Sequence, residues 1–300
     1  MALTTTNLAA EWVAKRAAGT SPGVNTPGLT TTWQDNIGSN DATLYTGSGG
    51  FAATTSSGWD GDGSSGDPYC LVSDGTNDYC TFTQPAALST HADFSIEIWT
   101  YVASQPSVNT NLFGGFVYTT VGLGVQYFVA SDGTGSWIIG DNTATPLYAA
   151  DQYSGYGASW QQHVLTYNAA THYAYPYRNA HLEWDSGVSG VNFQPYSGTH
   201  WIFFTDTGRP TTAIATARIY SVCLTAQQVL DNYNAGVTAA STDSAPALTT
   251  TAITAITATT ASSGGTITSE GSSAVTQYGV VWATHTLPVI ESDDHTHDKP

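Results

Sequence analysis

The chain has 300 residues, enough for two domains, and it carries 23 Asp and Glu against 6 Lys and Arg, a formal net charge of −17. This balance excludes a basic nucleic-acid-binding surface, and an anionic membrane would repel the chain. The 9 Trp, 17 Tyr and 9 Phe are enough to build a large aromatic core.

The first segment, residues 1–19, has no charged stretch followed by an apolar run, so we expect no signal peptide. No stretch of the sequence reaches the length of a membrane span. Either a leader is already absent or the protein leaves its cell without one, as a phage particle released by lysis does. Residues 8–14 that follow predict either a helix or a strand.

Two acidic loops precede the main strands, and both are candidates for binding Ca²⁺. Asp35 and Asp41 lie in a polar turn, and Asp60, Asp62 and Asp67 alternate with Gly and Ser. Calcium takes six to eight oxygen ligands, which such loops supply by turning several carboxylates inward. The alternative is a pair of solvated acidic loops without a metal ion.

Residues 70–82 predict a hairpin around the Asp74-Gly75 turn. Cys70 and Cys80 lie symmetrically about that turn, which would make them cross-strand neighbours. A disulfide between them is one alternative, and two buried free thiols is the other, because a one-residue bulge would put them on opposite faces. Cys223 is expected to be a small core residue.

The segment 93–102 is a strand with two different faces. Phe94, Ile96 and Ile98 lie on one face, which is apolar. Glu97 and Trp99 lie on the other, together with Tyr101. This pattern predicts a central strand, with one face against a second sheet and the other on a semi-exposed concave surface.

From residue 94 to residue 224, short strand-like runs alternate with Gly, Asn and Asp turns, a spacing typical of an all-β sandwich or barrel. One helix is expected next. Thr225 and Gln228 form a capping box, Val229 and Leu230 begin an apolar stripe, and Gly236 suits a left-handed stop.

Several segments together resemble the laminin-G-like branch of the concanavalin A-like lectin/glucanase superfamily, over residues 8–236. The segments that carry the resemblance are 33–35 with 40–44, 74–79, 94–99, 160–167, and 217–220 with 224–236. The resemblance implies a jelly-roll sandwich of two antiparallel sheets, and it makes residues 8–14 a strand. We therefore predict an all-β first domain over residues 1–237.

A second unit is expected after a linker at residues 238–247, which is rich in Ala, Ser and Thr. Residues 246–290 are similar to the Ig-like or fibronectin-III-like modules found on bacterial and phage surface proteins. About 55 residues are too few for a two-sheet sandwich of about 100 residues, so we predict an incomplete Ig-like β-sandwich over residues 248–300.

Glu97 is the residue to consider for catalysis, because glucanases of this superfamily carry paired carboxylates on a concave strand. Hydrolysis needs two carboxyl groups about 5–10 Å apart. Ser95 and Trp99 occupy the nearest positions on the same face, and Asp93 stands only at the start of the strand. We expect a structural role for Glu97, and we expect Glu97→Gln to leave the fold nearly intact.

Aromatic residues in the second half of the domain are candidates for stacking on sugar rings. Tyr173, Tyr175 and Tyr177 alternate along one strand and so share one face. Trp184, Tyr153 and Tyr156 are further candidates. For any single ring, burial in the core or in an interface is the competing interpretation.

These features predict a non-enzymatic, surface-exposed adhesion protein with a glycan-binding domain, carried on a phage virion as a head decoration, fibre or tail. The alternatives are an accessory carbohydrate-binding module of a secreted enzyme or adhesin, and a glycoside hydrolase. Expected partners are glycans, other virion or surface subunits, and a second copy of the chain. The expected location is the virion surface or the extracellular space, and Ca²⁺ is the one cofactor considered.

Overall fold

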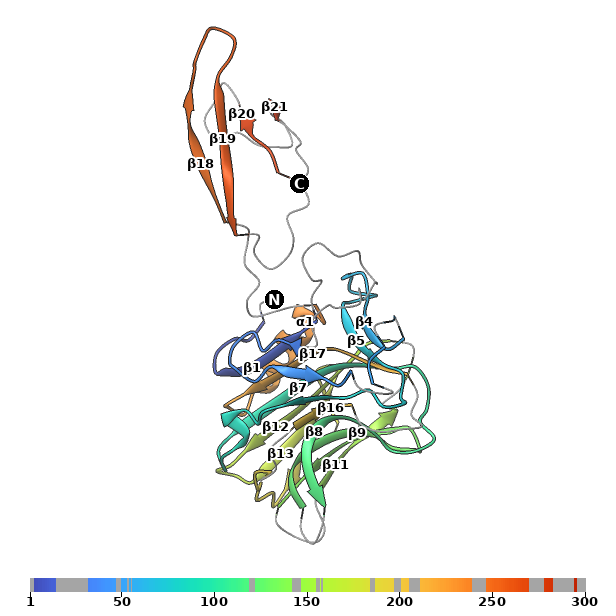
Figure 1. The fold of residues 1–300 in the computed structure, drawn as a ribbon. Helices are drawn as coiled ribbons and strands as arrows, with labels where there is room; N and C mark the ends of the chain where they lie inside the picture. The colour runs from blue at the N-terminus through green and yellow to red at the C-terminus, as the bar shows by residue number, and fades with distance from the viewer. Residues whose placement is uncertain are drawn as a thin grey trace. The chain divides into compact units, whose positions relative to one another are not determined.

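The computed structural model describes residues 3–14, 32–46, 50–52, 54, 56–118, 122–141, 147–154, 157, 159–183, 187–196, 201–204, 211–238, 247–269, 278–282 and 294–295. They belong to two compact units, Met1–Ser241 and Thr242–Pro300 (Figure 1). The division falls within the segment whose composition predicts a linker. None of the described helices is long and apolar enough to cross a membrane.

The first unit contains a large antiparallel sheet, here called sheet A. Its strands, in order across the sheet, are β14 (His181–Leu182), β13 (Tyr173–Arg178), β12 (Gln161–Asn168), β7 (Phe94–Val102), β17 (Thr212–Tyr220), β5 (Cys70–Ser73) and β4 (Gly58–Asp60). β1 (Leu8–Val13) pairs with β17, and β15 (Val188–Ser189) pairs with β13. The first strand is therefore the one that the family resemblance implies.

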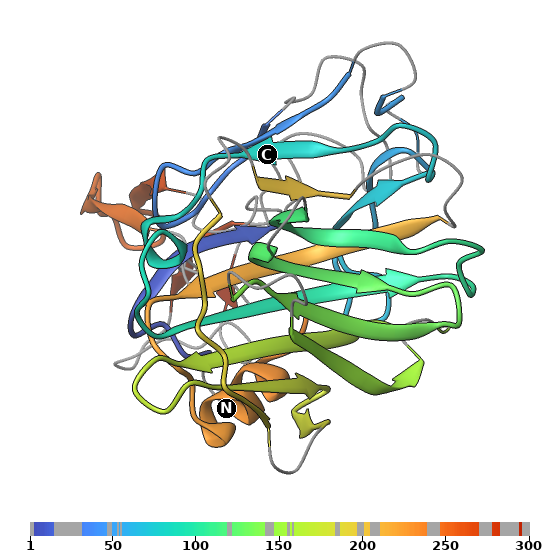
Figure 2. The ribbon, with the colours of Figure 1, turned by 90° about the horizontal axis from the view of Figure 1, so that it is seen from below.

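A second antiparallel sheet, sheet B, packs against sheet A (Figure 2). Its strands, in order, are β11 (Leu147–Ser154), β10 (Thr134–Ile139), β9 (Gly122–Val129), β8 (Thr110–Tyr118), β16 (Trp201–Phe203), β6 (Cys80–Phe82), β3 (Ala42–Leu44) and β2 (Thr32–Trp33). A short 3₁₀ helix, η1 (Ala86–Leu88), leads into β7. Two antiparallel sheets face to face confirm the predicted sandwich.

The core between the sheets is built from alternate residues of each strand. From β7 come Phe94, Ile96 and Ile98, each with an exposed fraction of 0%. Sheet B contributes aromatic side chains to the same core, among them Phe82 and Phe203, whose ring centroids lie 4.8 Å apart. Period-2 alternation is what places these side chains on one face, and burial of each large apolar side chain contributes about 1.5–3 kcal/mol.

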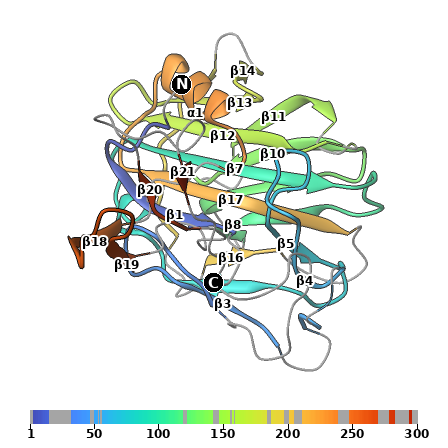
Figure 3. The same ribbon diagram turned by 90° about the horizontal axis from the view of Figure 1, so that it is seen from above.

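The other face of β7 is buried as well, contrary to the expected semi-exposed concave surface. Glu97 has an exposed fraction of 0% and Trp99 of 5%. The helix α1 (Ala226–Ala235) covers this face beside β12 and β13 (Figure 3). Its Tyr233 stacks on Trp99 with ring centroids 5.8 Å apart. Sequence periodicity assigns residues to a face but does not show what packs on that face.

The predicted capping box of α1 is confirmed. The Thr225 Oγ1 atom accepts a hydrogen bond from the Gln228 backbone N–H at 3.3 Å, and the Gln228 Oε1 atom accepts one from the Thr225 N–H at 2.9 Å. Gly236 follows the helix with a φ of 93°, a left-handed conformation that glycine adopts without strain.

The predicted hairpin over residues 70–82 is wrong, and of the two alternatives for its cysteines the structure has the two buried free thiols. β5 belongs to sheet A and β6 to sheet B, so the turn between them carries the chain from one layer to the other. Cys70 packs on the outer side of sheet A, whereas Cys80 lies in the core between the sheets. Both thiols are free, and burial, with the charges of Asp60 and Asp67, raises the pKa of Cys70 to about 12.

The second unit shows less than the Ig-like or fibronectin-III-like sandwich that the sequence predicts. β18 (Ala247–Thr254) and β19 (Ser262–Ser269) form an antiparallel two-stranded sheet, and β20 (Val281–Trp282) pairs with β21 (Asp294–His295). Among the described residues, Ile253 is 62% exposed and Ile256 72%. These strands do not enclose a core in the part of the unit that the structure describes.

The free thiols lead to a direct chemical prediction. In guanidinium chloride without reductant, a colorimetric thiol reagent should titrate all three cysteines of each chain. In the native protein Cys70 and Cys80 should react slowly, because their buried thiols remain protonated at neutral pH. A titre of one thiol per unfolded chain would show that a disulfide had formed.

Candidate functional site

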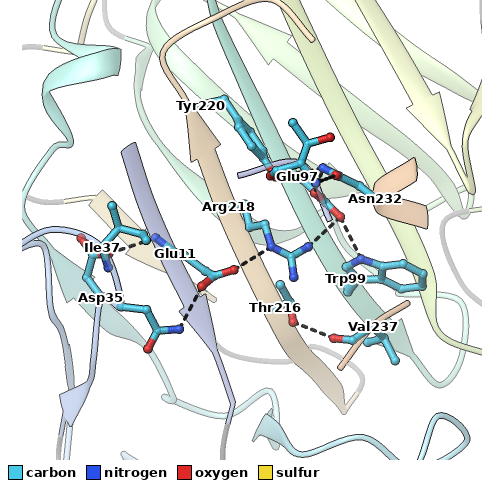
Figure 4. Close-up of polar contacts among 12 residues, drawn as sticks. Glu11, Asp35, Ile37, Glu97, Trp99, Thr216, Arg218, Tyr220, Asn232 and Val237 are labelled. Carbon is cyan, nitrogen blue, oxygen red and sulfur yellow. Dashed lines mark hydrogen bonds and ion pairs between the residues drawn. The ribbon is translucent and has the colours of Figure 1, made fainter. Parts of the chain in front are cut away.

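A buried ionic cluster lies on the outer face of sheet A, where three distant parts of the chain meet (Figure 4). Arg218 of β17 stands between two carboxylates. Its Nε atom lies 2.9 Å from Glu11 Oε1 on β1, and its Nη1 atom lies 3.0 Å from Glu97 Oε1 on β7. All three side chains have an exposed fraction of 0%, so this is a dry cluster.

The carboxylate of Glu97 accepts four hydrogen bonds. Besides Arg218, its Oε1 atom accepts from Trp99 Nε1 at 3.0 Å and from Gln162 Nε2 at 2.9 Å. Its Oε2 atom accepts from Asn232 Nδ2 at 2.8 Å. Because the side chain is also fully buried, a substrate has no access to this carboxylate in the structure.

The electrostatics of the cluster keep Arg218 charged and Tyr220 neutral. Burial opposes the charge of Arg218, but Glu97, Tyr220 and Glu11 together hold its pKa above the ordinary value. Burial and then the charge of Glu97 raise the pKa of Tyr220. The neutral phenol accepts from Asn232 Nδ2 at 2.9 Å and donates to the backbone oxygen of Thr4 at 3.2 Å. The role of Tyr220 in these hydrogen bonds is a structural one.

The polar turn after β2 is hydrogen-bonded to Glu11, on the other side of the cluster. Asn36 Nδ2 donates to Glu11 Oε2 at 3.1 Å, and the backbone N–H of Glu11 donates to Asp35 Oδ1 at 3.0 Å. Asp35 also accepts from Ile37 and Asn40. Although burial raises the pKa of Asp35, these hydrogen bonds lower it to below the ordinary value. Asp35 therefore shapes the turn with its carboxylate.

The other predicted calcium ligands lie in a different loop. Asp60 ends β4, while Asp62 and Asp67 are exposed. The backbone N–H of Asp62 donates to the backbone oxygen of Asp67 at 3.0 Å, which closes the loop. Slight burial, then the charges of Asp62 and Asp60, raise the pKa of Asp67. Within the described residues, no group of three or more His, Cys, Asp or Glu side chains is placed to hold a metal ion. The fit for calcium at Asp60, Asp62 and Asp67 is therefore poor.

Asp41 is the last of the predicted calcium ligands and lies in the turn with Asp35. It is exposed, and its Oδ1 atom accepts a hydrogen bond from the Asp35 backbone N–H at 2.9 Å. It caps the same turn that Asp35 shapes, and this use of the carboxylate is a structural one.

The three tyrosines of β13 form a row that runs from buried to partly exposed. Tyr177 has an exposed fraction of 6% and packs with Val164 and Val229 under α1. Tyr175 and Tyr173 are half-buried, and their rings stack with centroids 5.9 Å apart at an interplanar angle of 19°. The structure thus brings two of the three predicted platform residues to the surface of sheet A.

The side chains of the remaining aromatic candidates lie outside what the structure describes. Tyr153 belongs to β11 of sheet B, and its side chain lies outside the described residues. Tyr156 and Trp184 also lie outside the described residues. Their part in a binding surface stays a prediction.

Sequence reasoning missed the partners of Glu97, namely Arg218, Gln162 and Asn232. One signal was present: Arg218 is one of only 6 basic residues and stands inside the otherwise uncharged run of β17. A charge in a buried strand of such an acidic chain calls for a carboxylate partner. Nothing in the sequence identifies which of the 23 acidic residues that partner is.

A laminin-G family model described as the concanavalin A-like lectin/glucanases superfamily matches residues 74–230, which is more than half of the chain. The chain belongs to this superfamily. The match includes β7, β12, β13 and β17, and hence both Glu97 and the tyrosine row.

Solved structures share the fold at low sequence identity. Trypanosoma rangeli sialidase in complex with sialic acid has a TM-score of 0.54 and 11% identity over 78% of this chain and 34% of that chain. The receptor binding domain of botulinum neurotoxin mosaic serotype C/D has a TM-score of 0.53 and 13% identity over 76% of this chain and 50% of that chain. A search of curated proteins found no match. The chain spans between a third and a half of the length of these structures, and at such identity the likeness shows the fold alone.

The ionic cluster generates a stability prediction. Arg218→Met should lower the free energy of unfolding by about 3–5 kcal/mol, because it leaves two buried carboxylates without a cation. Glu97→Gln should cost about 1–3 kcal/mol, because the new amide turns a donor toward existing donors. This replaces the expectation of a nearly intact fold. Urea denaturation measures both values.

The control is Asp231→Asn on the surface of α1, which keeps the acceptor for Gln227 Nε2. Its free energy of unfolding should match that of the unmodified chain. A cost below about 0.5 kcal/mol for Arg218→Met would show that the cluster does not hold the sheet together.

Proposed function

We propose that the first unit is a non-enzymatic glycan-binding domain whose contact surface is the outer side of sheet A at β13. The partly exposed stack of Tyr173 and Tyr175 is the observation that carries this proposal. Sugar rings present C–H faces that pack on aromatic rings, and a stacked pair offers a rigid surface at little cost in conformational entropy.

Polar groups stand beside the stack, as sugar recognition requires. The strand register places Tyr173 opposite Asn168 on one side and opposite the exposed Ser189 on the other. Gly187 packs so closely that a Cβ atom there would come within 2.6 Å of the Tyr175 ring. This glycine has a φ of 65° and lets the chain pass alongside the ring. Hydroxyl and amide groups beside a flat aromatic surface are the usual means of orienting a sugar.

The charge of the domain favours neutral glycans. The one basic side chain on β13, Arg178, forms an ion pair with Glu183 at 3.5 Å. With a net charge of −17, the chain repels acidic sugars at long range. We therefore propose neutral hexoses or N-acetylhexosamines as the ligand class.

The setting we propose is the surface of a phage virion, as a head decoration, fibre or tail, where the second unit joins the domain to other subunits or to another copy. The low share of charged residues, 10% of the sequence, and the two-unit organisation support this setting. The alternative is an accessory carbohydrate-binding module of a secreted enzyme or adhesin. Capsid genes beside this gene would favour the first setting, and a leader peptide in the parent gene the second.

Binding by the tyrosine stack is tested with an array of neutral and acidic glycans. Tyr173→Ala and Tyr175→Ala should each weaken binding roughly fivefold to tenfold, because one stacking contact contributes about 1–1.4 kcal/mol. The matched control is Tyr45→Ala, since Tyr45 and Tyr79 form another stacked pair, with centroids 4.7 Å apart. Loss of binding only in Tyr45→Ala would move the site away from β13.

The absence of catalysis is a separate prediction. We expect no release of sugar from a panel of aryl glycosides and oligosaccharides at any pH between 4 and 9, because Glu97 is held by Arg218 and three further donors. A glycosidase activity that disappears in Glu97→Gln would contradict this assignment.

A further inference from the structure

The hairpin of the second unit has an unpaired outer edge on each of its strands. Among the described residues, β18 and β19 pair with each other and with no further strand (Figure 1). The side chains of residues 248–254, which make up most of β18, are all exposed. A two-stranded hairpin is only marginally stable in water, and three or more strands are required for a stable sheet. The hairpin would therefore gain stability from a further strand.

The edge of β18 lacks the residues that usually prevent strands from pairing between chains. Proteins protect open sheet edges with charged side chains, above all Lys, and with proline. Residues 247–269 contain no Asp, Glu, Lys or Arg and no proline. The pairing of β18 with β19 is irregular only before Leu248 and after Thr251, so residues 248–251 form a regular run. This run is open to pairing along its outer edge.

The distribution of charge favours a second copy of the chain as the partner. With a net charge of −17, two copies repel each other over most of their surfaces. The uncharged stretch 247–269 is a place where they can meet without bringing like charges together. Of its two strands, β18 is the better candidate, because Thr and Ile favour strands whereas the Gly264-Gly265 pair weakens β19.

We propose that β18 pairs antiparallel with β18 of a second copy, so that two hairpins form one four-stranded sheet about a two-fold axis. The same strand then serves both chains, as a two-fold interface requires. Leu248 and Ile253 lie near opposite ends of β18 and are 63% and 62% exposed. Antiparallel pairing brings the Leu248 end of each copy beside the Ile253 end of the other, which removes apolar surface from water twice.

The pairing gives the second unit a defined part in the proposed function. A dimer carries two first units, so a surface that presents many glycans is bound at two sites at once. Linked sites raise the apparent affinity without any new contact to the sugar. This gain in apparent affinity rests on the proposed glycan binding, whereas the pairing of the two β18 strands does not.

The experiment measures the mass of the full chain by sedimentation equilibrium over a wide range of concentration. The mass should rise with concentration from 31.5 kDa to twice that value. The double variant Thr249→Lys/Thr251→Lys should stay at the mass of one chain, because it places like charges on both sides of the new strand pair. The matched control Thr266→Lys/Thr268→Lys adds the same charge to β19 and should still form the dimer.

Three outcomes would overturn the proposal: a single-chain mass at every concentration, a dimer that persists in Thr249→Lys/Thr251→Lys, and a dimer lost equally in the β19 control. A single-chain mass in a sample that still binds glycans would reject the pairing and leave the proposed function standing.

Hydrogen exchange of the unmodified chain keeps the test usable if the lysine variants disturb the hairpin. The β18 amides that point away from β19 should exchange more slowly at concentrations where the dimer forms than in dilute solution, because the second copy accepts their hydrogen bonds. Equal exchange of these amides at both concentrations would also contradict the proposal.

Discussion

The pairing of one buried guanidinium with two buried carboxylates is the constraint on which the first unit depends. Arg218 joins Glu11 and Glu97 across sequence separations of 207 and 121 residues. A charge in a dry sheet face must be paired, so β1, β7 and β17 have to meet in one register for the charges to be satisfied. Asn232 extends the same cluster to α1 and fixes the helix on the sheet.

This use of the sheet face determines where binding can take place. In a sandwich the outer face of a central strand is a natural place for ligand chemistry, but here Glu97 is covered by Trp99, Asn232 and the helix above them. The tyrosine row of β13 extends beyond the part of the sheet that α1 covers, at Tyr175 and Tyr173. The surface open to a sugar therefore lies beside the buried cluster rather than on it.

Local patterns in the sequence predicted local structure well. The alternation of β7 identified its core face, and Thr225 and Gln228 marked the start of α1 through a capping box. The same patterns failed where a strand's partner mattered, because alternation does not say which sheet a strand joins. The hairpin predicted around Gly75 would have allowed Cys70 and Cys80 to be neighbours, yet their strands lie in opposite sheets. The contacts of Glu97 come from distant segments, so no spacing along β7 reveals them.

The most direct test of the central role of the ionic cluster is native-state hydrogen exchange of the full chain, comparing α1 with β7 and β17. If Arg218 and Glu97 hold the helix to the sheet, the amides of α1 should be protected with nearly the same free energy as those of β7. In Glu97→Gln the protection of α1 should fall first. Exchange of α1 amides within seconds in the unmodified chain, while β7 and β17 stay protected, would contradict the account.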